Sequence, residues 1–256
     1  MTCSTHMKGR IKPLGGYGVP LFGILAVALL APASAKGTLI LSLDEISGPD
    51  AGQPGSSATE YDPANTEVSY AGTLGDFSVT IDTGFSNESS PGTEATLDID
   101  TLDVKSLISA PVVLQVTLSD DGFTFPGLPG NVLNLASALG TTFQNSANTD
   151  TVTFQSTVSD TNSTVSTGLQ TSTSPGGGPV APGSSAPTPQ VPFDWVAASY
   201  TLQNVTTLTF STSGEIENVA GSTSTQVVSG SVPEPASLGT LALGGLMLMR
   251  RRRSAK

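Results

Sequence analysis

The sequence predicts an all-β protein: a single antiparallel β-sandwich flanked by an N-terminal signal helix and a C-terminal transmembrane helix. Three observations lead to this prediction. Apolar residues alternate with polar ones in short runs, which is the pattern of half-buried strands. Clusters of Gly, Pro, Asn and Asp separate these runs, as expected for turns. Each end of the chain carries an uncharged apolar stretch beside a group of basic residues.

Eight runs have the alternation of strands, as in Val112–Leu118, where Val112, Leu114, Val116 and Leu118 share one face. Eight to ten short strands suit an antiparallel sandwich, of which the jelly roll is one form. Only Val132–Leu139 has helical spacing. The predicted strands are Thr38–Ile46, Val68–Leu74, Asp76–Asp82, Ala95–Val104, Val112–Leu118, Thr151–Val158, Val196–Leu202 and Thr206–Thr212.

Residues 36–231 are predicted to form one domain between residues 1–35 and residues 232–256. Two stretches of this body have the composition of loops, Gly48–Pro63 and the Pro/Gly/Ser-rich segment Thr171–Pro192. We interpret the second as an insertion and not as a domain linker. The piece that follows it, Phe193–Ser229, offers two or three strands, too few to fold alone.

The body lacks the residue types on which several kinds of site depend. The chain's one cysteine and one histidine, Cys3 and His6, both precede residue 36. The body therefore has no disulfide, no Cys–His or Ser–His–Asp constellation and no histidine metal ligand. We predict that it is not an enzyme, with no catalytic, cofactor-binding or metal-ligating residue to assign.

The charge of the body limits its partners. It has two lysines, Lys36 and Lys105, against twenty acidic residues, a formal net charge of −18. Such a body repels nucleic acid and anionic lipid. Acidic surfaces attract divalent cations, so calcium is the one cofactor that stays open, although no loop has EF-hand spacing.

The N-terminal segment has the three parts of a secretory signal peptide. Its basic residues are Lys8, Arg10 and Lys12. An apolar run follows from Val19 to Ala31, and small residues stand at the positions that a signal peptidase reads, Ala33 and Ala35. We predict cleavage after Ala35. The alternative is a retained membrane anchor, but the apolar run is shorter than the ~20 residues of a spanning helix.

The C-terminal segment combines an extended motif, a short apolar helix and a basic end. Pro233 and Pro235 flank Glu234 and hold an extended backbone, because proline fixes φ and disfavours the α region in the preceding residue. The uncharged run from Ala236 to Met249 would span about 21 Å as a helix, less than a hydrocarbon core of roughly 30 Å. The cluster Arg250, Arg251, Arg252 and Arg253 predicts a cytoplasmic end.

This arrangement resembles the PEP-CTERM sorting signal of bacterial exported proteins, with Pro233, Glu234 and Pro235 as the motif. The resemblance covers about the last 25 residues. It implies that residues 232–256 are a sorting tail whose transmembrane helix lodges in the inner membrane until an exosortase-type enzyme cuts near the motif. It further implies release to the cell surface or the extracellular space. An ordinary single-pass tail anchor is the alternative.

Three local features are candidate site residues. Asp98 and Asp100 would lie on one strand face about 6–7 Å apart, near the spacing of paired glycosidase carboxylates, but alternation predicts a solvated face. Asp120, Asp121 and Gly122 have the composition of a hairpin turn. Trp195 could stack on a sugar ring, but we expect it in the core.

These patterns together predict a structural protein of the cell surface or extracellular matrix. Its expected partners are a signal peptidase, an exosortase-type enzyme and the membrane before cleavage, and the resemblance suggests a link with exopolysaccharide or biofilm. A glycan-binding module is the alternative, and a glycoside hydrolase with carboxylates alone is the remote one. A glycan-binding module would need an exposed aromatic platform.

Overall fold

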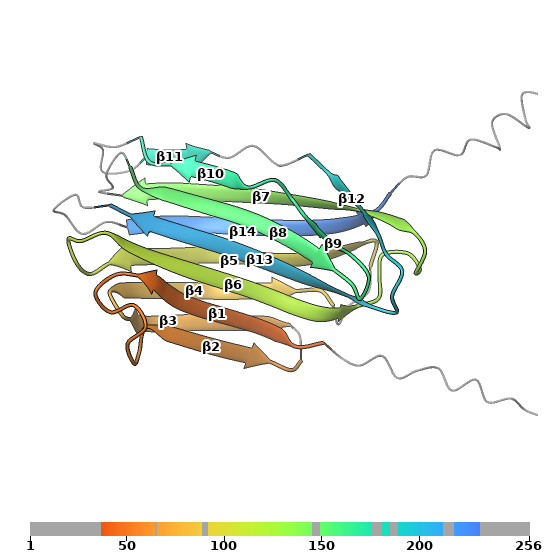
Figure 1. The fold of residues 1–256 in the computed structure, drawn as a ribbon, viewed down its shortest axis with the longest axis horizontal. Coiled ribbons are helices and arrows are strands. Elements are labelled where there is room, and N and C mark those ends of the chain that lie inside the picture. Colours follow the sequence, from red (N-terminus) through yellow and green to blue (C-terminus); the bar gives the residue numbers. More distant parts are fainter. Residues whose placement is uncertain are drawn as a thin grey trace, which may run out of the picture. The chain divides into compact units, whose positions relative to one another are not determined.

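The computed structural model describes residues 37–64, 66–88, 92–144, 149–175, 181–184, 189–211 and 218–230, with 181–184 described as backbone only. Within these ranges all regular secondary structure is β-strand, and the strands form two antiparallel sheets (Figure 1). The all-β prediction is therefore confirmed for the body. No helix among the described residues is long and apolar enough to cross a membrane.

Both predicted flanking helices lie outside the described residues. The same holds for the residues assigned to signal cleavage, to the sorting motif and to the cytoplasmic end. These residues are Ala33, Ala35, Pro233, Glu234, Pro235, Arg250, Arg251, Arg252 and Arg253.

Each sheet has seven strands within the described residues. The first sheet runs, in spatial order, β10 (Gln170–Thr173), β8 (Thr151–Ser159), β13 (Tyr200–Phe210), β6 (Val112–Phe123), β1 (Leu39–Ser47) and β2 (Ser57–Asp62), with β9 (Thr164–Ser166) also beside β8. The second runs β11 (Ala181–Ser184), β7 (Val132–Gln144), β14 (Asn218–Ser229), β5 (Glu94–Ser106), β4 (Phe77–Ser86) and β3 (Glu67–Leu74), with β12 (Val191–Asp194) also beside β7.

The last two of the described strands lie inside the sheets and not at their edges. β13 pairs with β6 on one side and β8 on the other. β14 pairs in the same way with β5 and β7. Among the described strands, the chain passes from one sheet to the other between β2 and β3, β5 and β6, β6 and β7, β7 and β8, β10 and β11, β12 and β13, and β13 and β14. The β13–β14 passage lies between the β5–β6 and β7–β8 passages, because β13 pairs with β6 and β8 and β14 pairs with β5 and β7.

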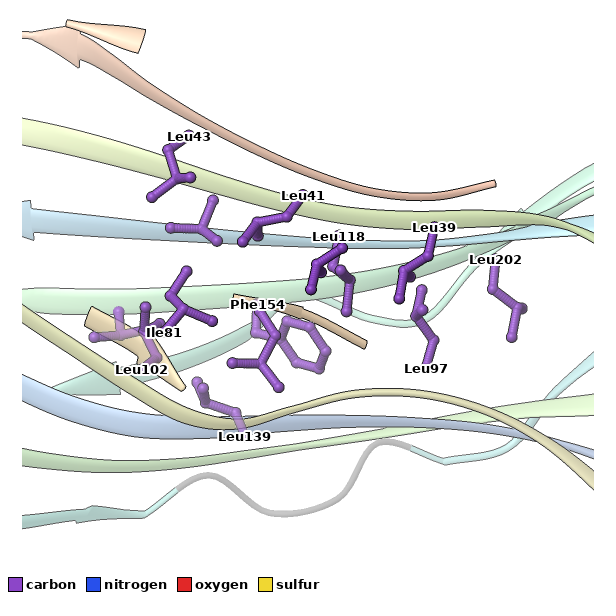
Figure 2. Packing of buried hydrophobic residues seen from close by; sticks show 14 of the residues in the cluster. Leu39, Leu41, Leu43, Ile81, Leu97, Leu102, Leu118, Leu139, Phe154 and Leu202 are labelled. Atoms are coloured by element: carbon purple, nitrogen blue, oxygen red, sulfur yellow. The ribbon is translucent and has the colours of Figure 1, made fainter. Parts of the chain in front are cut away.

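The core fills the space between the sheets because alternate side chains of each strand point into it. Leu39, Leu41 and Leu43 of β1 are at most 1% exposed. Figure 2 shows these leucines, with Leu118, Phe154 and Leu202, opposite Ile81, Leu97, Leu102 and Leu139 of the second sheet. Burial of each such side chain contributes roughly 1.5–3 kcal/mol.

The segment predicted as a hairpin turn lies within β6. Asp120, Asp121 and Gly122 belong to a β-bulge, in which Asp121 and Gly122 oppose Thr201 of β13 alone. Gly122 has a φ of 92°, a conformation that glycine adopts without steric cost. The turn prediction was wrong because a turn and a bulge demand the same residue types.

The segment with helical spacing is also a strand, β7. Leu133, Leu135, Ser137 and Leu139 all point inward, which is a period of two. Ser137 hides that period in the sequence because a polar residue occupies an inward position. Its burial is possible because the Gln170 side chain donates a hydrogen bond to its oxygen at 2.8 Å.

Both predicted loops contain strands. Gly48–Pro63 includes β2, whose side chains are exposed or half-buried, so no apolar alternation marks it. Thr171–Pro192 includes most of β10, all of β11 and the start of β12. These short strands lie beside β8 and β7, and most of their hydrogen-bonding partners come from residues 132–159.

The two runs predicted as separate strands, Val196–Leu202 and Thr206–Thr212, contribute to one strand, β13, which Val196–Ser199 precede. β13 begins at Tyr200 and continues to Phe210, and Thr212 lies outside the described residues. Asn204 stands between the two runs and points inward, which interrupts the apolar pattern. The other predicted strands overlap β1, β3, β4, β5, β6 and β8.

A chain of polar side chains joins the two sheets through the core. Ser156 of β8 bonds the Thr225 hydroxyl of β14 at 2.5 Å, and Thr225 donates to Asn204 Oδ1 of β13 at 2.5 Å. The Asn204 amide then donates to the Leu97 carbonyl of β5 at 2.6 Å. All three side chains are at most 1% exposed. Because Ser156, Thr225 and Asn204 each have a hydrogen-bond partner, this polar network fixes how the two sheets face each other.

We predict that Thr225→Val lowers the free energy of unfolding by about 1–3 kcal/mol, because Asn204 Oδ1 and Ser156 Oγ each lose a buried partner. Thr223→Val is the matched control on the same strand and the same inward face. The Thr223 hydroxyl is buried without a hydrogen-bond partner among the described residues, so its removal should be neutral or stabilising. Denaturant unfolding of both variants measures the difference, and equal effects would contradict the role of the chain.

Candidate functional site

A polar cleft of about 290 Å³ opens at one end of the first sheet. It lies where β6 and β8 end and β13 begins, and it includes two carboxylates, Asp121 and Asp160. Its remaining lining residues are Gly37, Gly122, Ser159, Thr161, Ser199, Tyr200 and Thr201. Its hydroxyl groups and two acids are groups that can hydrogen-bond a polar ligand.

Asp160 is fixed by the backbone on both of its oxygens. Its Oδ1 accepts N–H groups of Asn162 and Ser163, both at 2.8 Å. Its Oδ2 accepts those of Val196 at 3.0 Å and Ala197 at 3.2 Å. Burial opposes ionisation, but these donors outweigh it and lower the pKa of Asp160 to about 2. Asp160 therefore stays ionised at neutral pH and ties the segment after β12 to the end of β8.

Asp121 holds the start of the described chain. Its Oδ1 accepts the backbone N–H of Thr38 at 2.7 Å. Gly37 lies so close to Asp121 that a Cβ there would overlap the Asp121 carbonyl oxygen. Backbone donors thus keep one acid of the cleft ionised, and the other acid accepts a hydrogen bond from the Thr38 backbone.

The aromatic residues near the cleft are part of the core. Trp195 is 0% and Tyr200 2% exposed, so the prediction of a core role for Trp195 is confirmed. Their rings meet edge to face at 5.3 Å between centroids, and Phe123 stacks on Tyr200 at 5.5 Å. The Tyr200 hydroxyl donates to the Phe125 carbonyl, and burial raises the pKa of Tyr200. Neither ring presents a face on which a sugar could stack.

Asp98 and Asp100 lie on the outer face of the second sheet and not in the cleft. Their neighbours Leu97 and Ile99 are buried, as alternation predicts for a solvated face. Asp100 is exposed, whereas Asp98 is half-buried and accepts the Thr225 N–H at 3.0 Å. Burial is the main cause that raises the pKa of Asp98, and the charge of Asp100 adds to it.

Asp120 is a buried carboxyl group on β6, next in sequence to Asp121 of the cleft. It is 1% exposed, its Oδ2 accepts a hydrogen bond from the Ser86 hydroxyl of β4, and its Oδ1 has no partner among the described residues. Burial raises the pKa of Asp120 to about 7, against the Ser86 hydrogen bond and with help from the charges of Glu88 and Asp121. The group is therefore largely protonated in mildly acidic solution.

The burial of Asp120 and Glu45 was not predicted from the sequence, although the alternation along their strands places both on the inward face. Leu114, Val116 and Leu118 point inward, and Asp120 continues the same phase two residues later. Glu45 likewise follows Leu43 on the inward face of β1. In both strands, an acidic residue stands two positions after the last of several alternating apolar residues, and this spacing predicts that its side chain points inward.

No group of three or more His, Cys, Asp or Glu side chains within the described ranges is arranged to hold a metal ion. The described residues thus offer a polar cleft with two engaged carboxylates and several buried acids. Two of the buried acids, Glu45 and Asp120, have raised pKa values.

No family model and no curated protein sequence matches the chain. Among solved structures, it is similar to that of the infectious bursal disease virus Gx strain, with 11% identity and a TM-score of 0.32 over 88% of this chain and 55% of that one. The VP2 subviral particle of the same virus gives 12% identity and a TM-score of 0.20, covering 87% of this chain and 70% of that one. Scores this low carry no argument about fold or function.

We predict that Asp120 makes the protein less stable as pH rises. The folded pKa of about 7 exceeds the ordinary value of 3.8, so the folded state binds a proton that the unfolded chain has released between these values. The free energy of unfolding therefore falls from pH 4 to pH 7, by on the order of 3 kcal/mol from this group. Above pH 7 its contribution levels off.

Asp120→Asn keeps an acceptor for Ser86 without a charge and should remove that part of the slope, making the variant more stable than the natural protein at pH 8. The exposed Asp103→Asn is the control and should leave the slope unchanged. Glu45 and Asp98 also have raised pKa values, so the free energy of unfolding of Asp120→Asn should still fall with rising pH, but less steeply than that of the natural protein. Denaturant unfolding between pH 4 and pH 8 tests this, and identical slopes in Asp120→Asn and the natural protein would contradict it.

Proposed function

We propose that this chain is an exported structural protein of the cell surface or extracellular matrix, delivered by cleavage of its C-terminal tail. The observation that carries the proposal is the order of parts in residues 232–256: the motif Pro233–Glu234–Pro235, then fourteen uncharged residues, then four arginines. The motif supplies an extended substrate strand, the uncharged run a short membrane helix, and the arginines a cytoplasmic stop.

The character of the body supports a non-enzymatic role. A net charge of −18 favours solubility outside the cell and disfavours nucleic acid and anionic lipid as partners. The acids of its cleft are engaged by backbone N–H groups, and its buried aromatics serve the core. A structural role linked to exopolysaccharide or biofilm fits this combination best.

Glycan binding is the second candidate. The polar cleft beside Asp121 and Asp160 favours it, since hydroxyl-rich ligands bind through such groups. The burial of Trp195 and Tyr200 weighs against it because a sugar-stacking platform would need an exposed ring. Tyr61 on the edge strand β2 is exposed, but it stands on a different strand from those that line the cleft.

We also infer that the sandwich is a jelly roll. The strand pairing supports this inference, because each of the strands β5 to β8 pairs with strands that come later in the chain. β5 pairs with β14, β6 with β13, β7 with β11 and β12, and β8 with β9 and β10, so the chain forms a long antiparallel ribbon. Folding that ribbon over brings β14 beside β7 and β13 beside β8, the arrangement of two nested Greek keys. β1 to β4 then extend the two sheets.

The proposed delivery is tested by two tail variants in the native host. Replacing Arg250, Arg251, Arg252 and Arg253 by Ser removes the cytoplasmic stop, so uncleaved precursor should pass into the periplasm or medium. Replacing Pro233 and Pro235 by Ala leaves the anchor but lets the segment continue as helix. That variant should accumulate at full length in the membrane fraction.

The natural protein is the reference in both measurements. Intact mass of its surface form should lack the residues before about Lys36 and all four terminal arginines. Fractionation, followed by blotting with an antibody against the body, separates the three forms. If both variants fractionate like the natural protein, or if the arginines remain on its surface form, the proposal is wrong.

A further inference from the structure

Glu45 is a buried carboxylate with one oxygen left unsatisfied. It occupies the inward position after Leu43 on β1, at the opposite end of that strand from the cleft, and it is 1% exposed. Its Oε2 accepts the backbone N–H of Asp76 at 3.0 Å, whereas its Oε1 has no hydrogen-bond partner among the described residues. A buried carboxylate oxygen without a partner is costly, so this position calls for a further group.

A second carboxylate lies against it. Asp76 precedes β4 in the opposite sheet and is 6% exposed. Its Oδ2 accepts the Asp50 backbone N–H at 3.3 Å. Burial raises the pKa of Glu45, and the side chain of Asp76 and the charge of Asp50 raise it further. When two carboxyl groups lie side by side, one of them keeps its proton to a higher pH unless a positive charge lies between or beside them.

Two glycines, Gly48 and Gly75, bring the backbone close to this pair, and the Val112 side chain lies beside Gly48. A Cβ at Gly48 would overlap Glu45 Oε1 and would stand 3.1 Å from Asp76 Oδ2, so both oxygens face the same point. A Cβ at Gly75, whose φ is 51°, would overlap Glu45 Oε2. The loop 48–56 is held over the pair by a hydrogen bond from Gly75 N–H to the Gly55 carbonyl at 3.0 Å.

We propose that Glu45 and Asp76 bind a divalent cation, calcium by its ligand preference, beneath the loop 48–56. Calcium takes six to eight oxygen ligands, among them carboxylates, backbone carbonyls and water. Two carboxylates supply the charge here, and loop carbonyls and water complete the shell. A site with two carboxylates is consistent with the finding that no three acidic side chains converge in the described ranges.

The proposed site has a structural consequence because its two ligands come from different sheets. Glu45 belongs to β1 of the first sheet, and Asp76 directly precedes the strand β4 of the second. A bound cation therefore cross-links the two sheets at the end of β1 that is opposite the cleft. It stabilises the folded protein by mass action, because the unfolded chain does not bring the two carboxylates together. This inference is independent of the proposed role at the cell surface.

The test compares calcium with monovalent salt. The full chain, stripped with a chelator at pH 7.5, is unfolded by heat in millimolar CaCl₂ and in NaCl of matched ionic strength. The natural protein should gain several degrees more in calcium than in NaCl. Glu45→Gln should lose most of the calcium-specific gain yet melt higher than the natural protein without calcium, since the repulsion is gone. Asp103→Asn removes one exposed charge and should keep the gain.

Calorimetric titration with CaCl₂ gives a readout that does not require unfolding. The natural protein and Asp103→Asn should each bind one ion at this site, and Glu45→Gln or, if that variant fails to fold, Asp76→Asn should bind it roughly 10–100-fold more weakly. Equal responses to calcium and to matched NaCl would overturn the proposal, as would an unchanged calcium response in these variants. If acid stabilises the natural protein and calcium does not, and Glu45→Gln removes the acid effect, the pair holds a proton in place of a cation and the proposal is overturned.

Discussion

The sandwich depends on keeping alternate side chains of every strand in the space between the two sheets. Bulges preserve this alternation where a strand would otherwise lose it. Ile99 and Leu102 are both buried although three positions separate them, because Asp100 and Thr101 bulge opposite Ser222 of β14. The bulge at Asp121 and Gly122 does the same for Phe123. Without these corrections, one end of each strand would turn its apolar face to water.

The space between the sheets is not wholly apolar. Hydroxyl groups in it pair with one another, as Thr141 does with Ser172 at 2.6 Å and Ser137 with Thr167 at 3.1 Å. Serine and threonine are small enough to occupy inward positions without disturbing sheet spacing, and paired hydroxyls avoid the cost of burial. A chain this rich in Ser and Thr therefore builds an ordered core, provided that the inward hydroxyls meet across the gap.

The sequence was sufficient to predict the fold class and those strands whose inward residues are apolar, β1 and β8 among them. It was insufficient where inward residues are polar, as with Ser137 in β7, or where no side chain is buried, as in β2. The positions of Glu45 and Asp120 follow from the phase of their strands. Their partners Asp76 and Ser86 do not, because they lie more than thirty residues away in sequence.

The central place of β14 has a consequence for the order of folding. β14 pairs along its length with β5 and β7, and Val227 faces Ala95 and Leu135, residues that precede it by more than ninety positions. Such non-local contacts make folding slow, because the chain loses the entropy of closing long loops before these contacts can form. During synthesis the second sheet lacks its middle strand until residues 218–229 have emerged, and these residues directly precede the predicted tail. The second sheet can therefore be completed only after almost all of residues 37–230 have been synthesised.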